Sequence, residues 1–165
     1  MTLPEVVLVT DGGCVTRTRS GGWAAILIAV ADRMAEPIVP LINQQTGEPY
    51  ITMLHGHVAD TTVNQMEILV VLQGLRQLRR PTKVRVVSDS NLVVKTMAEG
   101  WKRDKNQTLW QALDQAIVAH DVRWEWTKGH AANYWNQRAD ALVAQERVTP
   151  GDTPHIDDVL AGVSR

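Results

Sequence analysis

The hydrophobic pattern of this 165-residue chain changes its period near Thr61, and that change limits the folds open to it. Before Thr61, apolar residues form continuous or alternating runs at 6–10, 23–30 and 50–58, which predict three strands. After Thr61, apolar residues at helical spacing alternate with short β-branched runs. We therefore expect one sheet built from all the strands and covered by helices.

The second half predicts helices and strands in alternation. Thr62-Val-Asn-Gln65 fits a capping box that opens a long helix, and Pro81 ends that helix. The later elements are expected as a strand at 83–88, a helix opened by Asp89-Ser90-Asn91, a helix around 109–117, a strand at 122–127 and a last helix around 139–143. The predicted fold class is α/β, a mixed five-stranded sheet in the element order βββαβααβα, flanked by helices. The first three strands are expected to be antiparallel, with Asp11 to Gly22 as a connecting loop, and the later strands parallel to the first.

The length suits one domain, which we place at 1–148, with a loop excursion at about 31–50 that carries three prolines. Residues 149–165 hold two prolines and three aspartates and are expected to form a flexible tail. The longest apolar run, Trp23–Ala31, is much shorter than the roughly 20 residues that cross a membrane, so no membrane association is expected. Because Cys14 is the single cysteine and no secretory signal precedes it, we expect a reducing, cytoplasmic location.

Charge is distributed unevenly along the chain. The net charge of −1 excludes a bulk polycation, but residues 76–105 carry nine Lys or Arg against three acids. A basic segment inside a nearly neutral domain is typical of a phosphate-binding face, and it is also typical of solvated helix faces. Charge alone leaves both interpretations open.

Four acids stand where a site can form. Asp11 and Asp89 each follow a predicted strand, and parallel strands bring their carboxyl ends to one edge of a sheet. Glu67 lies among apolar residues in the expected first turn of the long helix, and Asp140 lies near the packed face of the last helix. Taken singly, each also fits an ordinary role as a turn residue, cap or surface acid. If they converge, oxygen ligands alone favour Mg²⁺ or Mn²⁺.

Five short motifs occur in order along the chain. They are Val9–Gly13, Thr62–Glu67, Val87–Asn91, Trp124–Ala131 and Asn136–Asp140. With these motifs the chain resembles ribonuclease H type 1 over nearly all of residues 5–147.

The resemblance implies an endonuclease that cleaves the RNA strand of RNA/DNA hybrids and leaves 5′-phosphate products. It implies that Asp11, Glu67, Asp89 and Asp140 hold two Mg²⁺ ions, with Mn²⁺ as a possible substitute. His130, beside Gly129 in a loop, matches a histidine that helps with proton transfer or product release. The implied partner is a hybrid duplex, bound by a monomer.

Substrate contacts are expected on both sides of the acids. The resemblance assigns Gly13, Cys14, Thr62, Asn64 and Asn91 to the two strands of the hybrid. Charge and stacking add Arg17, Trp101, Lys102 and Arg103. The chain departs from the family pattern in the arginines that follow Cys14, in Asn91 where glutamine is common, and in a short 100–109 segment where many members carry a basic protrusion.

Two other functions remain open on the sequence. One is a non-catalytic hybrid- or RNA-binding module, which the four acids disfavour because an anionic cluster without metal repels nucleic acid. The other is a nuclease of the same superfold that acts on DNA, which the Lys128-Gly129-His130 loop disfavours. Separately, His55 and His57 share one strand face and could hold a metal, but the sequence shows no third ligand.

Overall fold

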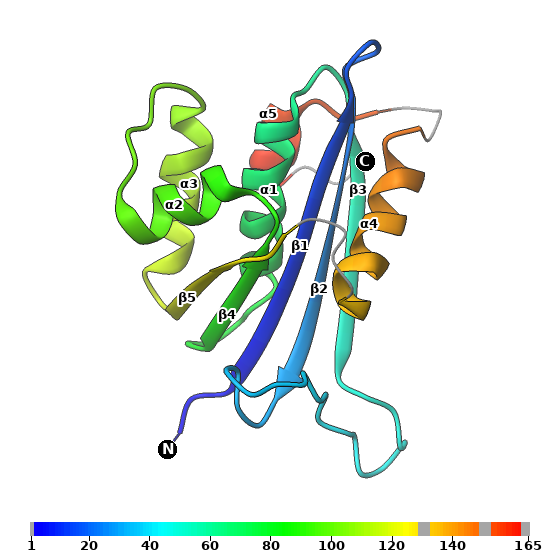
Figure 1. The fold of residues 1–165 in the computed structure, drawn as a ribbon, viewed down its shortest axis with the longest axis vertical. Coiled ribbons are helices and arrows are strands. Elements are labelled where there is room, and N and C mark those ends of the chain that lie inside the picture. The colour runs from blue at the N-terminus through cyan, green and yellow to red at the C-terminus, as the bar shows by residue number, and fades with distance from the viewer. Residues whose placement is uncertain (1, 129–132, 149–152, 163–165) are drawn as a thin grey trace.

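The computed structural model describes residues 2–128, 133–148 and 153–162. Its strands form one mixed sheet in the order β3-β2-β1-β4-β5 (Figure 1). The strands are β1 (Glu5–Val15), β2 (Ser20–Val30), β3 (Ile51–Val58), β4 (Lys83–Ser88) and β5 (Asp121–Trp126). β1, β2 and β3 pair antiparallel, whereas β4 pairs parallel with both β1 and β5. The predicted mixed five-stranded sheet is confirmed.

Helices cover both faces of this sheet (Figure 1). They are α1 (Val63–Arg76), α2 (Asn91–Glu99), α3 (Gln107–Ile117), α4 (Tyr134–Glu146) and α5 (Ile156–Leu160). Local signals set several ends: the Thr62 hydroxyl accepts from the Gln65 N–H at the start of α1, and Gly100 ends α2 in the left-handed conformation, with φ of 71°. The order βββαβααβα is confirmed as far as α4, and α5 was not expected.

Alternation along β1 divides the core into two layers. Val6 and Leu8 pack on the α1 side of the sheet, whereas Val7 and Val9 pack on the α4 side. Successive side chains of a strand point to opposite faces, so both layers are filled by one continuous apolar run. The same alternation directs Asp11 and Gly13 to the α4 side and Gly12 to the α1 side.

β1 and β2 are longer than the sequence suggested. β1 continues through Asp11 to Val15 and β2 begins at Ser20, so the predicted loop from Asp11 to Gly22 is wrong. The turn spans only 16–19. Polar residues and glycines concealed this part of the hairpin, because they lack the apolar pattern that predicts strands.

The two segments expected to be irregular are both attached to the sheet. Within 153–162, where a flexible tail was expected, α5 packs on the core and Arg76 donates to the carbonyls of Val159 and Leu160. The 31–50 excursion is anchored by buried Arg33, which bonds to the Val84 carbonyl and the Asp121 side chain. It lies at the end of the sheet opposite the carboxyl ends of β4 and β5 (Figure 1). Across the described ranges we find no helix with the length and apolar character that spanning a bilayer requires.

The last turn of α4 rests directly on the β1–β2 pair, where Gly13 and Gly22 are register partners. A Cβ atom at Gly22 would lie 2.8 Å from the backbone nitrogen of Arg147 and 2.9 Å from the carbonyl oxygen of Val143. At Gly13 the nearest atom, at 3.0 Å, belongs to the Val143 side chain. Helix α4 can approach the sheet closely because these two positions lack side chains.

We therefore expect Gly22→Ala to lower the free energy of unfolding by about 1–3 kcal/mol, the usual effect of overpacking against backbone that cannot move aside. Gly13→Ala is the matched control and should cost less, because a side chain can adjust. Urea denaturation of both variants tests this. Equal losses would show that the backbone contact at Gly22 does not set the position of α4.

Candidate active site

The parallel ladder between β1 and β4 places two acids side by side. Its last register pair is Thr10 with Ser88, and the next residue on each strand is an aspartate, Asp11 and Asp89. Asp11 thus follows the end of the parallel pairing, although β1 itself continues beside β2. Asp89 does not cap α2, because Ser90 does so by accepting from the Val93 N–H. The Asp89 carboxylate does not serve as a cap and is therefore available to the site.

Glu67 reaches the same place through a close approach of α1 to β1. A Cβ atom at Gly12 would lie 2.7 Å from the backbone carbon of Met66 and 2.8 Å from the nitrogen of Glu67, so only glycine fits. The Gly12 N–H donates to Asp11 Oδ1 at 3.0 Å and to Glu67 Oε1 at 3.2 Å. Glu67 stands in the second turn of α1 rather than the first, which carries no acid.

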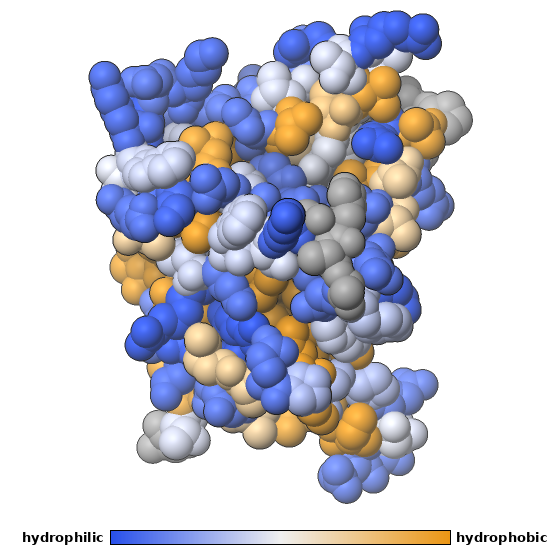
Figure 2. Space-filling view, viewed as in Figure 1, coloured by the Kyte–Doolittle hydropathy of each residue, from blue (hydrophilic) through white to orange (hydrophobic). Residues whose placement is uncertain are grey.

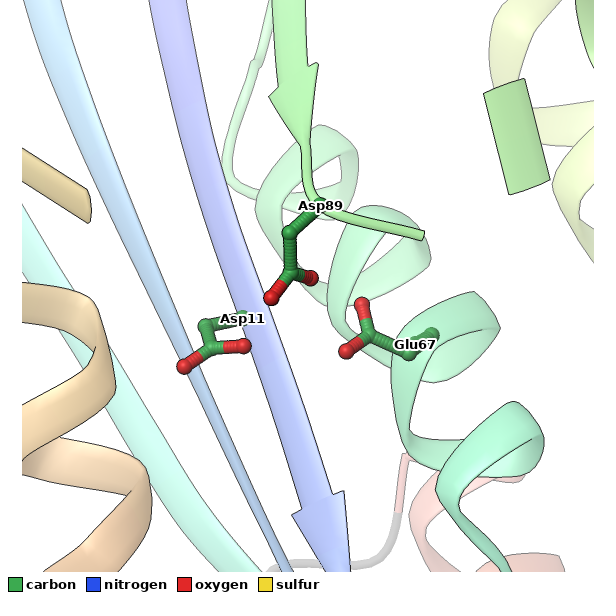
Figure 3. Close-up of side chains that lie close together, drawn as sticks. All are labelled: Asp11, Glu67 and Asp89. Atoms are coloured by element: carbon green, nitrogen blue, oxygen red, sulfur yellow. The ribbon is translucent and has the colours of Figure 1, made fainter. Parts of the chain in front are cut away.

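The three carboxylates point toward one another from β1, from the end of β4 and from α1 (Figure 3). One oxygen from each of Asp11, Glu67 and Asp89 lies within 4.8 Å of the others. Glu67 Oε2 and Asp89 Oδ1 are buried without a hydrogen-bond partner. Buried carboxylate oxygens without partners are costly, and a hard divalent cation would satisfy them. The donor set fits such a cation.

Crowding of like charges changes how these acids ionise. Burial, followed by the charges of Asp89 and Asp140, raises the pKa of Asp11 from near 3.8 to about 8. Burial and the neighbouring carboxylates of Asp89 and Asp11 likewise raise the pKa of Glu67 well above its ordinary value. Asp140 on α4 is thus close enough to Asp11 to act on its pKa, and it lines the same cleft. The fourth predicted acid therefore joins the other three.

The carboxylates lie in a cleft of about 480 Å³. Four of the residues predicted to contact substrate line it: Gly13, Cys14, Asn64 and Asn91. Asn64, in the first turn of α1, and Asn91, which opens α2, are both exposed. Their amides can hydrogen-bond to a ligand that lies across the acids.

The other predicted contacts lie elsewhere. Thr62 caps α1 with its hydroxyl, and Arg17 is exposed in the β1–β2 turn. Exposed Trp101 and Lys102 belong to the loop between α2 and α3, where hydrophilic side chains gather (Figure 2). Lys102 also lines a second cleft, of about 220 Å³, that shares Asn64 with the first.

Arg103 is engaged inside the protein. Its guanidinium bonds to both carboxylate oxygens of Asp114 and lies over the Trp110 ring, 5.3 Å from the centroid. The Asp114 hydrogen bond, partly opposed by burial, raises the pKa of Arg103. The sequence predicted a substrate contact, but this side chain already joins the α2–α3 loop to α3. His130 and Gly129 fall outside the described residues.

Two features near α4 were missed or left incomplete by the sequence. Glu146 is the third member of the His55–His57 group: its Oε1 lies 2.5 Å from His55 Nδ1, and its Oε2 lies 3.0 Å from His57 Nδ1. Burial would raise the pKa of Glu146, but the hydrogen bonds from the two histidines outweigh it and lower the pKa.

Arg147 lines the main cleft. Its spacing of seven residues from Asp140 is the sequence signal that could have found it, since residues two turns apart share a helix face.

Comparison with known proteins identifies the family of the chain. The RNase H family model matches residues 4–147. Ribonuclease H of Dinoroseobacter shibae is 39% identical over 161 residues, which cover 90% of this chain and 94% of the relative. Ribonuclease H of Phenylobacterium zucineum is 40% identical over 152 residues, with coverage of 84% and 88%.

Solved structures share the fold. A crystal structure of LC9-RNase H1, a type 1 RNase H with the type 2 active-site motif, superposes with a TM-score of 0.67 at 24% identity, covering 88% of this chain and 72% of that one. The N-terminal RNase H domain of rv2228c from Mycobacterium tuberculosis gives a TM-score of 0.67 at 20% identity, covering 98% of both chains. With the family match over most of its length, the chain belongs to the RNase H family.

The raised pKa of Asp11 predicts how stability without metal depends on pH. A carboxyl group that binds its proton more tightly in the folded chain stabilises the fold at low pH, and this contribution is lost as pH rises from about 4 to about 8. In EDTA near pH 8, Asp11→Asn should therefore melt higher than the wild type, by about 2–4 °C for each kcal/mol relieved. The difference should shrink toward about pH 4.

Thermal melts of both proteins in EDTA and in millimolar Mg²⁺ provide the measurement. Mg²⁺ should raise the melting temperature of the wild type more than that of the variant. A variant that melts lower in EDTA, with equal shifts by Mg²⁺, would show that Asp11 serves only as an ordinary turn or strand residue.

The contrast between Lys102 and Arg103 yields a second prediction. Lys102→Gln should leave stability unchanged, because exposed ion pairs such as the one with Asp104 contribute little. Arg103→Gln should lower the free energy of unfolding by about 1 kcal/mol, since it breaks a bidentate pair and a ring contact. Urea denaturation measures both. A loss in Lys102→Gln as large as that in Arg103→Gln would contradict the assignment.

Proposed function

We propose that this protein is an endoribonuclease that hydrolyses the RNA strand of RNA/DNA hybrids and leaves 5′-phosphate ends. The observation that carries the proposal is the cleft that Asp11, Glu67, Asp89 and Asp140 line together, in which Glu67 Oε2 and Asp89 Oδ1 are buried without a hydrogen-bond partner. Membership of the RNase H family supports the substrate class.

The four acids are proposed to hold two Mg²⁺ ions, for which Mn²⁺ can substitute. When bound, such ions lower the pKa of water and stabilise the oxygen that leaves in an in-line displacement. The protein's own part is to hold the acids in place: the Gly12 N–H fixes one oxygen each of Asp11 and Glu67. The Trp126 indole donates to the Asp89 carbonyl at 3.1 Å and fixes the backbone there.

Selection of a hybrid requires contacts to sugar edges across a wide minor groove. Asn64 and Asn91 are suited to this role, because their exposed amides stand at the cleft on the starts of two different helices. An amide both donates and accepts, as does a ribose 2′-hydroxyl. His130 is proposed to carry a proton during the reaction or to assist product release.

The proposal extends to assembly and location. We propose a monomer, because a single chain supplies all four acids of the cleft. We propose a cytoplasmic location, because Cys14 is a free thiol, as expected in a reducing compartment.

Asp89→Asn tests the proposal. Loss of one carboxylate should keep the fold and the affinity for a hybrid, but lower the cleavage rate by more than about a hundredfold. Labelled RNA/DNA hybrid, duplex RNA and duplex DNA are each incubated with Mg²⁺ or EDTA, and only the hybrid with Mg²⁺ should be cut. Glu48→Gln, an exposed acid in the 31–50 excursion, is the matched control.

Three results would contradict the proposal. If Asp89→Asn retains more than about a tenth of the wild-type cleavage rate, the acids are not required for cleavage. Cleavage of duplex DNA at the rate of the hybrid would indicate a DNA-directed nuclease. Hybrid binding without any cleavage by the wild type would indicate a binding module.

A further inference from the structure

The last turn of α4 is held against the sheet from two directions. Gly13 and Gly22 leave room for its backbone, which lies within 2.8 Å of a Cβ position at Gly22. Glu146 bonds through its two oxygens to His55 and His57 on β3. The residue after Glu146 is therefore held at the edge of the carboxylate cleft.

The residue that follows is Arg147. Its Nη1 atom lies 3.7 Å from a Cβ position at Gly13, and its side chain lines the cleft together with Asp11 and Asp140. Its guanidinium makes no salt bridge or side-chain hydrogen bond anywhere in the described chain, unlike Arg33, Arg85 and Arg103, which pair with carboxylates. A cation that lines the same cleft as four acids, but forms no ion pair with them, is available to an external anion.

The geometry of β1 indicates which anion fits. Asp11 and Gly13 face the same side of β1 and are two residues apart, about 6.6 Å along a strand. That separation is comparable with the distance between neighbouring phosphates along one nucleic-acid strand. If the reacting phosphate lies at Asp11 and the cleaved strand runs along β1, the next phosphate of that strand lies beside Gly13 and Arg147.

We infer that Arg147 binds the phosphate adjacent to the reacting one on the cleaved strand, an inference that rests on the proposed function. A guanidinium is the side chain best suited to this, because its planar N–H groups bind phosphate oxygens in pairs. Arg147 also offsets the repulsion between the acidic cleft and a polyanionic substrate. It is a substrate-positioning contact and takes no part in the chemical step.

Arg147→Gln tests the inference. Its KM for a hybrid should rise about tenfold while kcat stays within about twofold, because a ground-state contact is lost. The slope of log affinity against log salt should fall by about 1, since one phosphate contact disappears. Arg147→Lys should recover part of the affinity. Arg123→Gln, an exposed arginine on β5 that does not line the cleft, is the matched control and should change neither quantity.

The contacted phosphate can be located with neutral linkages. A single methylphosphonate is placed at successive linkages of the cleaved strand, on deoxynucleotides that flank the RNA. At the linkage next to the reacting one, the neutral group should weaken binding to the wild type and leave binding to Arg147→Gln unchanged. If the methylphosphonate and Arg147→Gln weaken hybrid binding additively at every linkage of the cleaved strand, the inference is overturned.

The dissociation constant for the hybrid, measured in the Asp89→Asn background with and without Arg147→Gln, separates this inference from the proposed function. An unchanged affinity and salt slope would show that Arg147 only balances the charge of the acids, and would overturn the inference even if the wild type cleaves hybrids. Failure of the wild type to cleave, with the affinity loss present, would overturn the proposed function and leave the phosphate contact standing.

Discussion

The parallel pairing of β1 with β4 is the constraint on which the site depends. Because the ladder ends at Thr10 and Ser88, Asp11 and Asp89 emerge together at one point of the sheet edge. Every other part of the site is arranged around that pair. α1 brings Glu67 to it across Gly12, and α4 brings Asp140 to it from the other face.

This arrangement opposes stability in the metal-free protein. Carboxylates that are buried together repel one another, and two of their oxygens lack a hydrogen-bond partner. The fold tolerates them because both faces of the sheet are covered by well-packed apolar layers. Repulsion between the carboxylates thus destabilises the metal-free protein locally, and a bound cation would relieve it. The packed core is stable enough to tolerate this cost.

Positive charge around the cleft is divided between structure and substrate. Arg33, Arg85 and Arg103 lie in networks that attach loops to the sheet or to α3. Arg147 is held at the cleft by a helix end that glycines and a buried glutamate position, and its guanidinium has no ion pair or hydrogen bond among the described residues. The number of cations in a sequence therefore says less about nucleic-acid binding than the partners that each cation already has.

Periodicity and capping signals in the sequence predicted the order of the elements as far as α4, and the rules for hairpins and crossover connections predicted how the strands pair. The four acids became a candidate set through the short motifs that resemble the RNase H family. Periodicity, caps and short motifs each involve residues that are close in the sequence, so they are visible in a single chain. The true end of β1, the helix after residue 153, the engagement of Arg103 and the role of Glu146 depend on contacts between residues far apart in the sequence. Arg147 is the clearest case: only the packing of α4 on Gly13 and Gly22 places its guanidinium near Gly13 in the cleft that Asp11 lines, because a helix acquires its position on a sheet from tertiary contacts alone.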